Sequence, residues 1–225
     1  EKMDRGQLTP LQMVKDNVMP HFPPILHVHF RDRFRDALEW YEARALYTRS
    51  TALWSMVGHL VGLGDRHGEN LLLHASGEMC HCDFACMFDK GEALEVPERV
   101  RFRLTPNVVD ALGVTGTEGA FRRACELALS VAAKHKAMVV GLLETFVHDP
   151  LVEWTARQSS NSNASRNNPR VLIARVVRRL DGHVDLYGDK DTVALSTEGQ
   201  VTKLVHASRS IDALSKMYTW WMPWI

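Results

Sequence analysis

One segment, "GLGDRHGENLLLHASGEMCHCDF" (62–84), limits the folds open to this chain more than any other. The run before it, residues 37–63, carries apolar side chains at helical spacing. Inside the segment, a short apolar run (71–73) and a second strand-like run (79–84) flank "SGE" (76–78), which has the composition of a turn. The pattern predicts a long helical region, then a loop and a small antiparallel hairpin.

The rest of the chain is predicted to be mainly helical, with breaks where the sequence supplies them. The prolines of "MPHFPPILHVHF" (19–30) require any preceding helix to stop near Val18. Polar side chains at Arg49 and Ser50 indicate a break inside the long helical run, and 197–216 has the pattern of an amphipathic helix. Another long helix is expected with Thr117 as its N-cap and an apolar stripe formed by Phe121, Ala124, Leu127, Ala128 and Val131.

Charge and cysteine content exclude several classes of protein. Lys and Arg total 27, as do Asp and Glu, so no global basic field favours direct nucleic-acid binding by this segment. Neither a signal peptide nor an apolar run long enough to span a bilayer is found in the sequence. Cys80, Cys82 and Cys86 lie too close together for a disulfide framework and lack the paired spacing of a structural zinc site, so we expect reduced thiols in a strand core.

Three oxygen-bearing side chains in the 62–84 segment have the spacing of a phosphotransferase site. Asn70 lies five positions after Asp65, and Asp83, the first residue of an Asp-Phe pair, lies 18 positions after it. In protein kinases an Asp at the first position orients the substrate hydroxyl, and the other two residues bind Mg²⁺. A hairpin returns the chain so that Asn70 and Asp83 can share one cation, to which phosphate and water supply the remaining hard oxygens.

The order of residues around Asp65 differs from that of most protein kinases. Those enzymes place His and Arg before the Asp, whereas here Arg66 and His67 follow it. The reversed order places His67 within reach of the transferring phosphoryl group, as a donor or proton shuttle. Arg66 is expected to support the same transition state.

The reversed loop resembles that of the phosphoinositide-3-kinase-related protein kinases (PIKKs), which reads G-D-R-H-x-x-N. The stretches "PERVRFRLTPNVVDALG", "EGAFRRACELAL" and "FVHDPLVEW" are similar to the end of that family's activation segment and its later helices. The final residues, "MYTWWMPWI", are similar to the family's FATC tail. Two departures are Ala85, where a Gly usually follows Asp-Phe, and Arg101, where the family usually has Pro.

The resemblance implies a mainly α fold: a protein-kinase-like C-lobe with a small β-hairpin, followed by a FATC helix and tail. No glycine-rich phosphate loop is found, and Lys2 and Lys15 lie too close to Asp65 for the missing strands, so the N-lobe is expected before Glu1. Without it, the segment alone is expected to be inactive. The implied domains are a C-lobe (1–154) with catalytic loop 62–70 and activation segment 83–105, a Ser/Asn-rich linker and regulatory region (155–193), and FATC (194–225).

The resemblance also implies a function. The expected activity is transfer of the γ-phosphate of ATP, with Mg²⁺ or alternatively Mn²⁺, to Ser or Thr followed by Gln in proteins. The expected setting is nuclear DNA-damage and replication-stress signalling, with an obligate partner bound through a scaffold outside this segment. The segment implied to engage the substrate is Phe102, Arg103, Leu104 and Thr105.

Two other functions remain open on the sequence. A lipid kinase shares the reversed loop, but four basic and five acidic residues between 83 and 105 give a net charge of −1, which does not favour an anionic headgroup. A non-catalytic scaffold of the same family would have lost Asp65, Asn70 and Asp83, which are present.

We also expect the aromatic tail to pack on the C-lobe rather than enter a membrane. Arg175, Arg178 and Arg179 are expected to form a solvated helix face.

Overall fold

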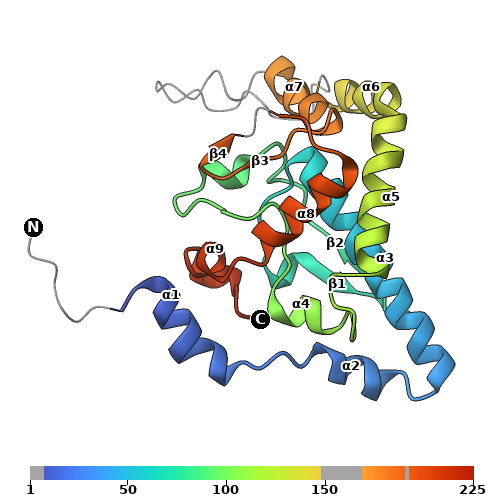
Figure 1. Cartoon of the computed structure of the whole chain (residues 1–225), viewed down its shortest axis with the longest axis vertical. Coiled ribbons are helices and arrows are strands. Elements are labelled where there is room, and N and C mark those ends of the chain that lie inside the picture. The colour runs from blue at the N-terminus through green and yellow to red at the C-terminus, as the bar shows by residue number, and fades with distance from the viewer. Residues whose placement is uncertain (1–7, 148–168, 191–192) are drawn as a thin grey trace, which may run out of the picture.

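The computed structural model describes residues 8–147, 169–190 and 193–225, and these fold mainly into helices (Figure 1). None of the helices in these ranges is long and apolar enough to cross a bilayer. The elements in chain order are α1 (Pro10–Gln12), η1 (Met13–Val18), η2 (Met19–His21), α2 (Leu26–Arg33), α3 (Ala37–Val61), η3 (Gly68–Asn70), β1 (Leu71–Leu73), β2 (Met79–His81), η4 (Lys90–Ala93), α4 (Pro106–Asp110), α5 (Ala120–Lys134), α6 (Lys136–Val147), α7 (Pro169–Leu180), β3 (Asp185–Leu186), β4 (Asp189–Lys190), α8 (Thr197–Ser208), α9 (Ile211–Ser215) and η5 (Thr219–Trp221).

Helix α3 is the central element, and it delivers the chain to the 62–84 segment (Figure 1). The Asp36 carboxylate caps its first turn, and Gly62 ends it in the left-handed conformation that a helix C-terminus favours. The predicted break at Arg49 and Ser50 is wrong. The Ser50 hydroxyl donates to the Leu46 carbonyl (2.8 Å) and accepts the N–H of Met79 (2.9 Å), so this polar residue is satisfied without interrupting the helix.

The β-hairpin is present as predicted, and it packs against α3. Strands β1 and β2 pair antiparallel, with Leu71 opposite His81 and Leu73 opposite Met79. The hairpin lies near the middle of the molecule, between α2 and α4 at one end and α6 and α7 at the other (Figure 1). Because the two strands are antiparallel, the loop before β1 and the chain after β2 lie at the same end of the hairpin.

Helix α5 covers α3, and its buried face differs from the predicted stripe. Phe121, Cys125 and Leu129 are buried, and Ala124 and Ala128 of the predicted stripe pack against the same core, whereas Leu127 and Val131 are exposed. Thr117 is not the N-cap. The helix begins after Gly119, and the Thr117 hydroxyl instead accepts a hydrogen bond from Arg209 (3.0 Å). Tertiary packing on α3, rather than the count of apolar residues, selects the buried face.

The C-terminal elements pack onto this core. Helix α7 contacts α6 and α3, α8 contacts α5, and α9 contacts α1. The helix predicted over 197–216 is divided, because Ser210 caps a new helix, α9, with its hydroxyl on the N–H of Ala213 (3.3 Å). Apart from Pro169 and Arg170, which begin α7, the Ser/Asn-rich stretch 155–170 lies outside the described residues.

The arginines of α7 do not form a single solvated face. Arg175 and Arg178 are partly exposed, but the Arg179 side chain is only 3% exposed. Its guanidinium donates to both carboxylate oxygens of Asp89 (2.5 and 2.7 Å), and Arg101 lies 3.1 Å from the same carboxylate. Burial alone would raise the pKa of Asp89, but Arg179 and Arg101 outweigh it and hold that pKa below its usual value. The prediction of a solvated face is therefore wrong for Arg179.

Candidate functional site

Asp65 occupies the loop between α3 and the hairpin, in a left-handed backbone conformation (φ 60°). This conformation is unfavourable for residues other than glycine. Both of its backbone polar groups are bound by side chains: its N–H donates to Glu98 Oε1 (2.9 Å), and its carbonyl accepts from Asn70 Nδ2 (2.8 Å). The Asp65 carboxylate itself is 45% exposed, so a substrate can reach it.

His67 lies beside that carboxylate. Its Nδ1 accepts the backbone N–H of Glu69 (3.2 Å), which caps the short helix η3. Because Nδ1 is an acceptor, the neutral imidazole carries its proton on Nε2, which lies 3.8 Å from Asp65 Oδ1. The imidazole can therefore donate a hydrogen bond toward the substrate-facing side of Asp65.

Asn70 and Asp83 stand at the open end of the hairpin. The N–H of Cys82 donates to the Asn70 carbonyl (3.1 Å), so Asp83 follows directly after the residue opposite Asn70. Asp83 is exposed and also left-handed (φ 56°). Asp65, Asn70 and Asp83 thus belong to one connected pair of loops.

This pair of loops can hold a divalent cation. Asn70 uses its Nδ2 on the Asp65 carbonyl, which leaves the amide oxygen as an acceptor. Asp83 Oδ1 accepts the N–H of Ala85 (2.9 Å), which leaves Oδ2 available. One amide oxygen and one carboxylate oxygen are hard ligands suited to Mg²⁺ or Mn²⁺.

The partner of Asp83 in the Asp-Phe pair is held against α3. Phe84 stacks on Trp54 with ring centroids 6.0 Å apart, and Trp54 stacks on His81 at 5.0 Å. Burial, followed by the charge of Arg66, lowers the pKa of His81 to about 3, so His81 is neutral under physiological conditions. Trp54 therefore fixes the chain on both sides of Asp83.

Arg66 does not reach the position expected of a residue that contacts phosphate. Its side chain is buried, and burial lowers the pKa of the guanidinium. The guanidinium donates to the backbone carbonyls of Gly64 (2.7 Å), Cys82 (2.6 Å) and Asp83 (2.5 Å). Arg66 joins the two loops from behind, so the support for the transition state that the sequence led us to expect stays a prediction and would act through these loops rather than by contact with phosphate.

The segment predicted to engage the substrate lies in the core. Phe102, Leu104 and Thr105 are all at most 3% exposed, and Arg103 is also buried. Phe102, Leu104 and Thr105 are therefore out of reach of a peptide in this structure, whereas Arg103 also lines the larger of the two hollows described below. A role of the 102–105 segment in substrate choice stays a prediction, and it would act through backbone groups, neighbouring residues or Arg103.

Three residues lie behind the catalytic loop: Glu98 and Trp221, which were not assigned a site role from the sequence, and Arg103, which was assigned only to the substrate segment. Glu98 Oε1 accepts both the N–H of Asp65 and the indole N–H of Trp221 (2.9 Å each). Arg103 lies over the Trp221 ring, 4.5 Å from its centroid. The Arg103 guanidinium also donates to the carbonyls of Trp221 (2.6 Å), Met222 (2.9 Å), Ile225 (2.8 Å) and Arg66 (3.4 Å).

The site therefore has two layers. The front layer comprises Asp65, His67, Asn70 and Asp83, and the back layer comprises Arg66, Glu98, Arg103 and Trp221. Glu98 and Arg103 belong to "PERVRFRLT", where their charges among apolar residues were the available signal. Burial lowers the pKa of Arg103 to about 10, so it remains charged at neutral pH.

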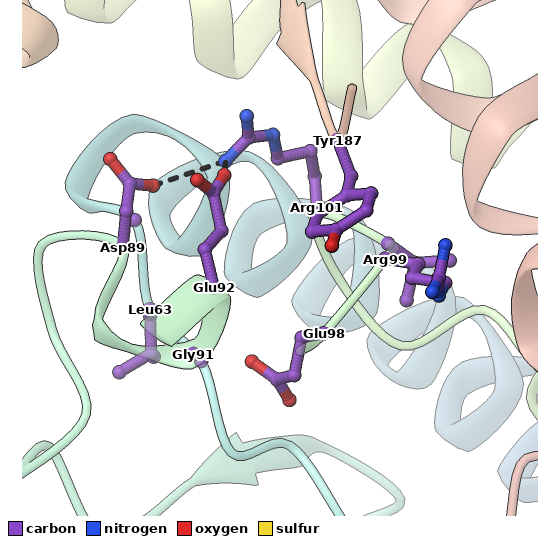
Figure 2. A pocket seen from close by; sticks show the side chains of 11 residues that line it. Leu63, Asp89, Gly91, Glu92, Glu98, Arg99, Arg101 and Tyr187 are labelled. Carbon is purple, nitrogen blue, oxygen red and sulfur yellow. Dashed lines mark hydrogen bonds and ion pairs between the residues drawn. The ribbon is translucent and has the colours of Figure 1, made fainter. Parts of the chain in front are cut away.

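Two hollows border these layers. Figure 2 shows the smaller one, whose lining includes Glu98, Arg99, Tyr187 and the paired Asp89 and Arg101; its volume of about 20 Å³ is enough for a single water. The larger, about 780 Å³, is lined by residues of α2, β1 and α4, together with Gly68 of the catalytic loop, Arg103 of the back layer and Ile225 of the tail. It has room for a ligand, but none of the four front-layer residues lines it.

Comparisons with known proteins agree with the expected family. Residues 2–156 match the family described as "Phosphatidylinositol 3- and 4-kinase", and residues 194–225 match the FATC domain. The chain is 48% identical to "Serine/threonine-protein kinase ATR" of Oryza sativa subsp. indica, over 96% of this chain and 8% of that protein. It is 46% identical to the protein of the same name from Arabidopsis thaliana, over 95% of this chain and 8% of that protein.

A solved structure, "FAT and kinase domain of CtTel1", superimposes with a TM-score of 0.82 at 34% identity, over 96% of this chain and 14% of that one. The mainly helical C-lobe fold with a small hairpin and a FATC region is thereby confirmed. This chain spans less than a tenth of the length of these two curated relatives. It belongs to the phosphatidylinositol 3- and 4-kinase family, among the phosphoinositide-3-kinase-related kinases that also carry a FATC domain.

Proposed function

We propose that this chain supplies the catalytic C-lobe and FATC region of an ATR-like serine/threonine protein kinase. The observation that carries the proposal is the front layer. An exposed Asp65 carboxylate stands beside a histidine N–H, and Asn70 and Asp83 end the adjacent loops. The similarity to kinases named "Serine/threonine-protein kinase ATR" supports a protein substrate.

Asp65 is the residue placed to receive the substrate hydroxyl. As the Ser or Thr oxygen bonds to the γ-phosphorus, the bond from that phosphorus to the β–γ bridging oxygen breaks, and the hydroxyl proton passes to Asp65. His67 donates from Nε2 toward the transferring group, beside Asp65 Oδ1. General-base assistance of this kind is worth roughly 10²–10⁴-fold in rate.

Asn70 and Asp83 would hold a divalent cation, Mg²⁺ or Mn²⁺, through the two oxygens that their hydrogen bonds leave available. The cation would neutralise negative charge on the ATP phosphates. Arg66 keeps both loops in place by binding carbonyls of each. Residues of this chain therefore orient the acceptor and the phosphates, and we assign the adenine and phosphate contacts missing here to an N-lobe elsewhere in the full-length protein.

The wider biology follows from the relatives and is part of the proposal. We place the full-length protein in nuclear DNA-damage and replication-stress signalling, with an obligate ATR-interacting type of partner bound outside this segment. We assign 1–154 to the C-lobe, 155–193 to a linker and regulatory region, and 194–225 to FATC. Neither nucleic acid nor a membrane is proposed as a direct ligand of this segment.

The matched family description also names lipid kinases, so a phosphoinositide substrate is the competing activity. Two arginines of the activation segment are already bound to other groups of the chain in this structure. Arg101 is paired with Asp89 and Glu92, and Arg103 is buried among carbonyls of the tail. A protein substrate therefore fits this segment better than an anionic headgroup.

The full-length kinase with its partner tests the proposal. We expect phosphorylation of a peptide array with preference for Ser or Thr followed by Gln, dependent on ATP and a divalent metal. Phosphoinositide vesicles serve as the alternative substrate in the same assay. Equal phosphorylation without Gln rejects the substrate preference, phosphorylation of vesicles alone rejects a protein kinase, and no transfer to either favours a scaffold.

A further inference from the structure

Glu98 connects two parts of the chain that are far apart in sequence. Its Oε1 accepts the backbone N–H of Asp65 and the indole N–H of Trp221, both at 2.9 Å. One carboxylate oxygen thus touches the catalytic loop and the FATC tail together. Burial raises the pKa of Glu98 although both N–H donors oppose that shift.

The backbone around Glu98 is shaped to admit its carboxylate. A Cβ atom placed on Gly64 or on Gly91 would overlap Glu98 Oε2. The N–H of Glu98 also donates to the carbonyl of Gly91 (3.0 Å). The glycine that precedes Asp65 is therefore needed for space, and the loop is built around Glu98.

Asp65 needs such a support because of its backbone conformation. A left-handed backbone is unfavourable for a residue other than glycine, so the φ of 60° at Asp65 persists only where the surroundings hold it. Asn70 binds the Asp65 carbonyl and Glu98 binds its N–H. Loss of the Glu98 contact frees the peptide that precedes Asp65 and lets the carboxylate turn away from the acceptor.

Trp221 is the tail residue that makes this contact. Its side chain is 4% exposed, against 58% for the neighbouring Trp220. The ring lies beneath Arg103, and its N–H is directed to Glu98. The docked tail therefore donates a hydrogen bond to Glu98 Oε1, the same oxygen that accepts the N–H of Asp65.

We propose that Glu98 is a positioning residue that keeps Asp65 in its productive conformation, and that the indole N–H of Trp221 fixes Glu98 in this role. The proposal rests on the proposed kinase activity and names the side chain through which the tail acts on it. Glu98 touches neither ATP nor acceptor; it acts through Asp65.

Steady-state kinetics of the full-length kinase test the proposal. For Glu98→Ala we expect kcat to fall about 100-fold, the effect of misplacing a catalytic group by about 1 Å, while KM for ATP changes little. Glu98→Gln keeps an Oε1 acceptor and should retain most of the activity. Trp221→Phe keeps a buried ring but loses the N–H donor, and should lower kcat about threefold to tenfold.

The double variant separates coupling from general damage. Trp221→Phe should add almost nothing in the Glu98→Ala background, because the shared contact is already gone. Trp220→Phe, at the exposed neighbour, is the matched control and should behave as wild type. Equal losses for Glu98→Gln and Glu98→Ala, or additive losses in the double variant, would overturn the proposal.

Hydrogen exchange supplies a readout that does not depend on activity. The Asp65 amide should exchange faster in Glu98→Ala than in wild type or Glu98→Gln, with α5 unchanged. Unchanged exchange at Asp65 refutes the positioning role. If exchange behaves as expected but wild type transfers no phosphate, the proposed function fails while the Glu98 contact stands.

Discussion

The front and back layers of the site differ in how their residues are held. In the front layer, Asp65 and Asp83 are accessible and both have left-handed backbones. In the back layer, Arg66, Arg103 and Trp221 are buried, and each makes hydrogen bonds to chain segments remote in sequence. The residues proposed to perform chemistry therefore make few contacts of their own and depend on a buried network.

The difference explains why the two layers should respond differently to mutation. Truncating Asp65 or Asp83 of the front layer removes chemistry but little packing, because both side chains are accessible to solvent. Truncating a back-layer side chain removes packing, and it also leaves buried polar partners unsatisfied. Loss of activity without loss of structure is the expected signature of the front layer, and loss of both activity and structure is that of the back layer.

The largest expected effect is on rate, from the front layer of the full-length kinase. Asp65→Ala, Asn70→Ala and Asp83→Ala should each abolish most activity, with losses of about 10²–10⁴-fold for removal of the base. The C-lobe should stay folded by hydrogen exchange. Peptide phosphorylation as a function of Mg²⁺ concentration should show a weaker metal response in Asp83→Ala.

Glu69→Ala is the control for that series. Glu69 is an exposed acid in the same loop, and its side chain has no part in the proposed mechanism. Near-normal turnover of Asp83→Ala would show the metal assignment to be wrong. Parallel losses in Glu69→Ala would mean that any change in this loop is damaging.

The next largest effect concerns the tail. Ending the full-length chain after Lys216 should lower both activity and stability, because it removes Trp221 and the carbonyls that Arg103 binds. Burial of one Trp removes about 150–250 Å² from water, worth roughly 4–6 kcal/mol before ordering costs. Thermal unfolding and turnover in detergent-free buffer measure the two losses.

If the tail instead bound a membrane, the opposite effect of truncation on turnover would be expected. Truncation would then leave turnover intact and abolish binding to liposomes. Trp220→Ala distinguishes the two further, since Trp220 is exposed and should matter only to a membrane. The docking of Trp221 in the described structure favours loss of activity.

The sequence predicted the front layer and the hairpin because both depend on local spacing. Asp65, Asn70 and Asp83 are joined by a loop and two short strands, whose order alone brings them together. The back layer could not be predicted this way. Glu98 and Trp221 are 123 positions apart, and only the packed fold brings them into contact.

Where the structure differs from the sequence-based predictions, the cause is again a contact between residues far apart in the sequence. The position of Arg66 beside Asp65 suggested chemistry, but the carbonyls of Cys82 and Asp83 draw its guanidinium inward. The composition of α7 suggested a solvated arginine face, but a buried carboxylate at Asp89 binds Arg179. In each case a long-range polar partner, invisible to periodicity, decided where the side chain lies.

A smaller loss, in stability rather than rate, is expected at the Asp89 cluster. Asp89→Asn leaves Arg179 and Arg101 without their shared counter-charge, and breaking a buried pair in this way costs about 3–5 kcal/mol. Glu92→Gln is the control, because Glu92 is 37% exposed and its pair with Arg101 is worth about 0–1 kcal/mol. Hydrogen exchange of α7 and η4 measures both, and equal effects would contradict the burial argument.

The smallest expected effect is a difference in pH dependence between two acids of opposite shift, Asp89 and Glu98. Asp89 has a lowered pKa, so its contribution to stability is present above its unfolded pKa and is lost as pH falls through the lower folded value. Glu98 has a raised pKa, so the folded state is penalised above the folded value and gains relative stability as pH falls through it. As pH falls through the raised folded pKa of Glu98, the stability difference between wild type and Glu98→Gln should therefore shift in favour of wild type. The difference between wild type and Asp89→Asn should stay nearly constant at pH values above the ordinary pKa of aspartate. Opening free energies from hydrogen exchange, measured as a function of pH and corrected for intrinsic rates, give both differences, and a pH-independent Glu98→Gln difference would contradict the raised pKa of Glu98.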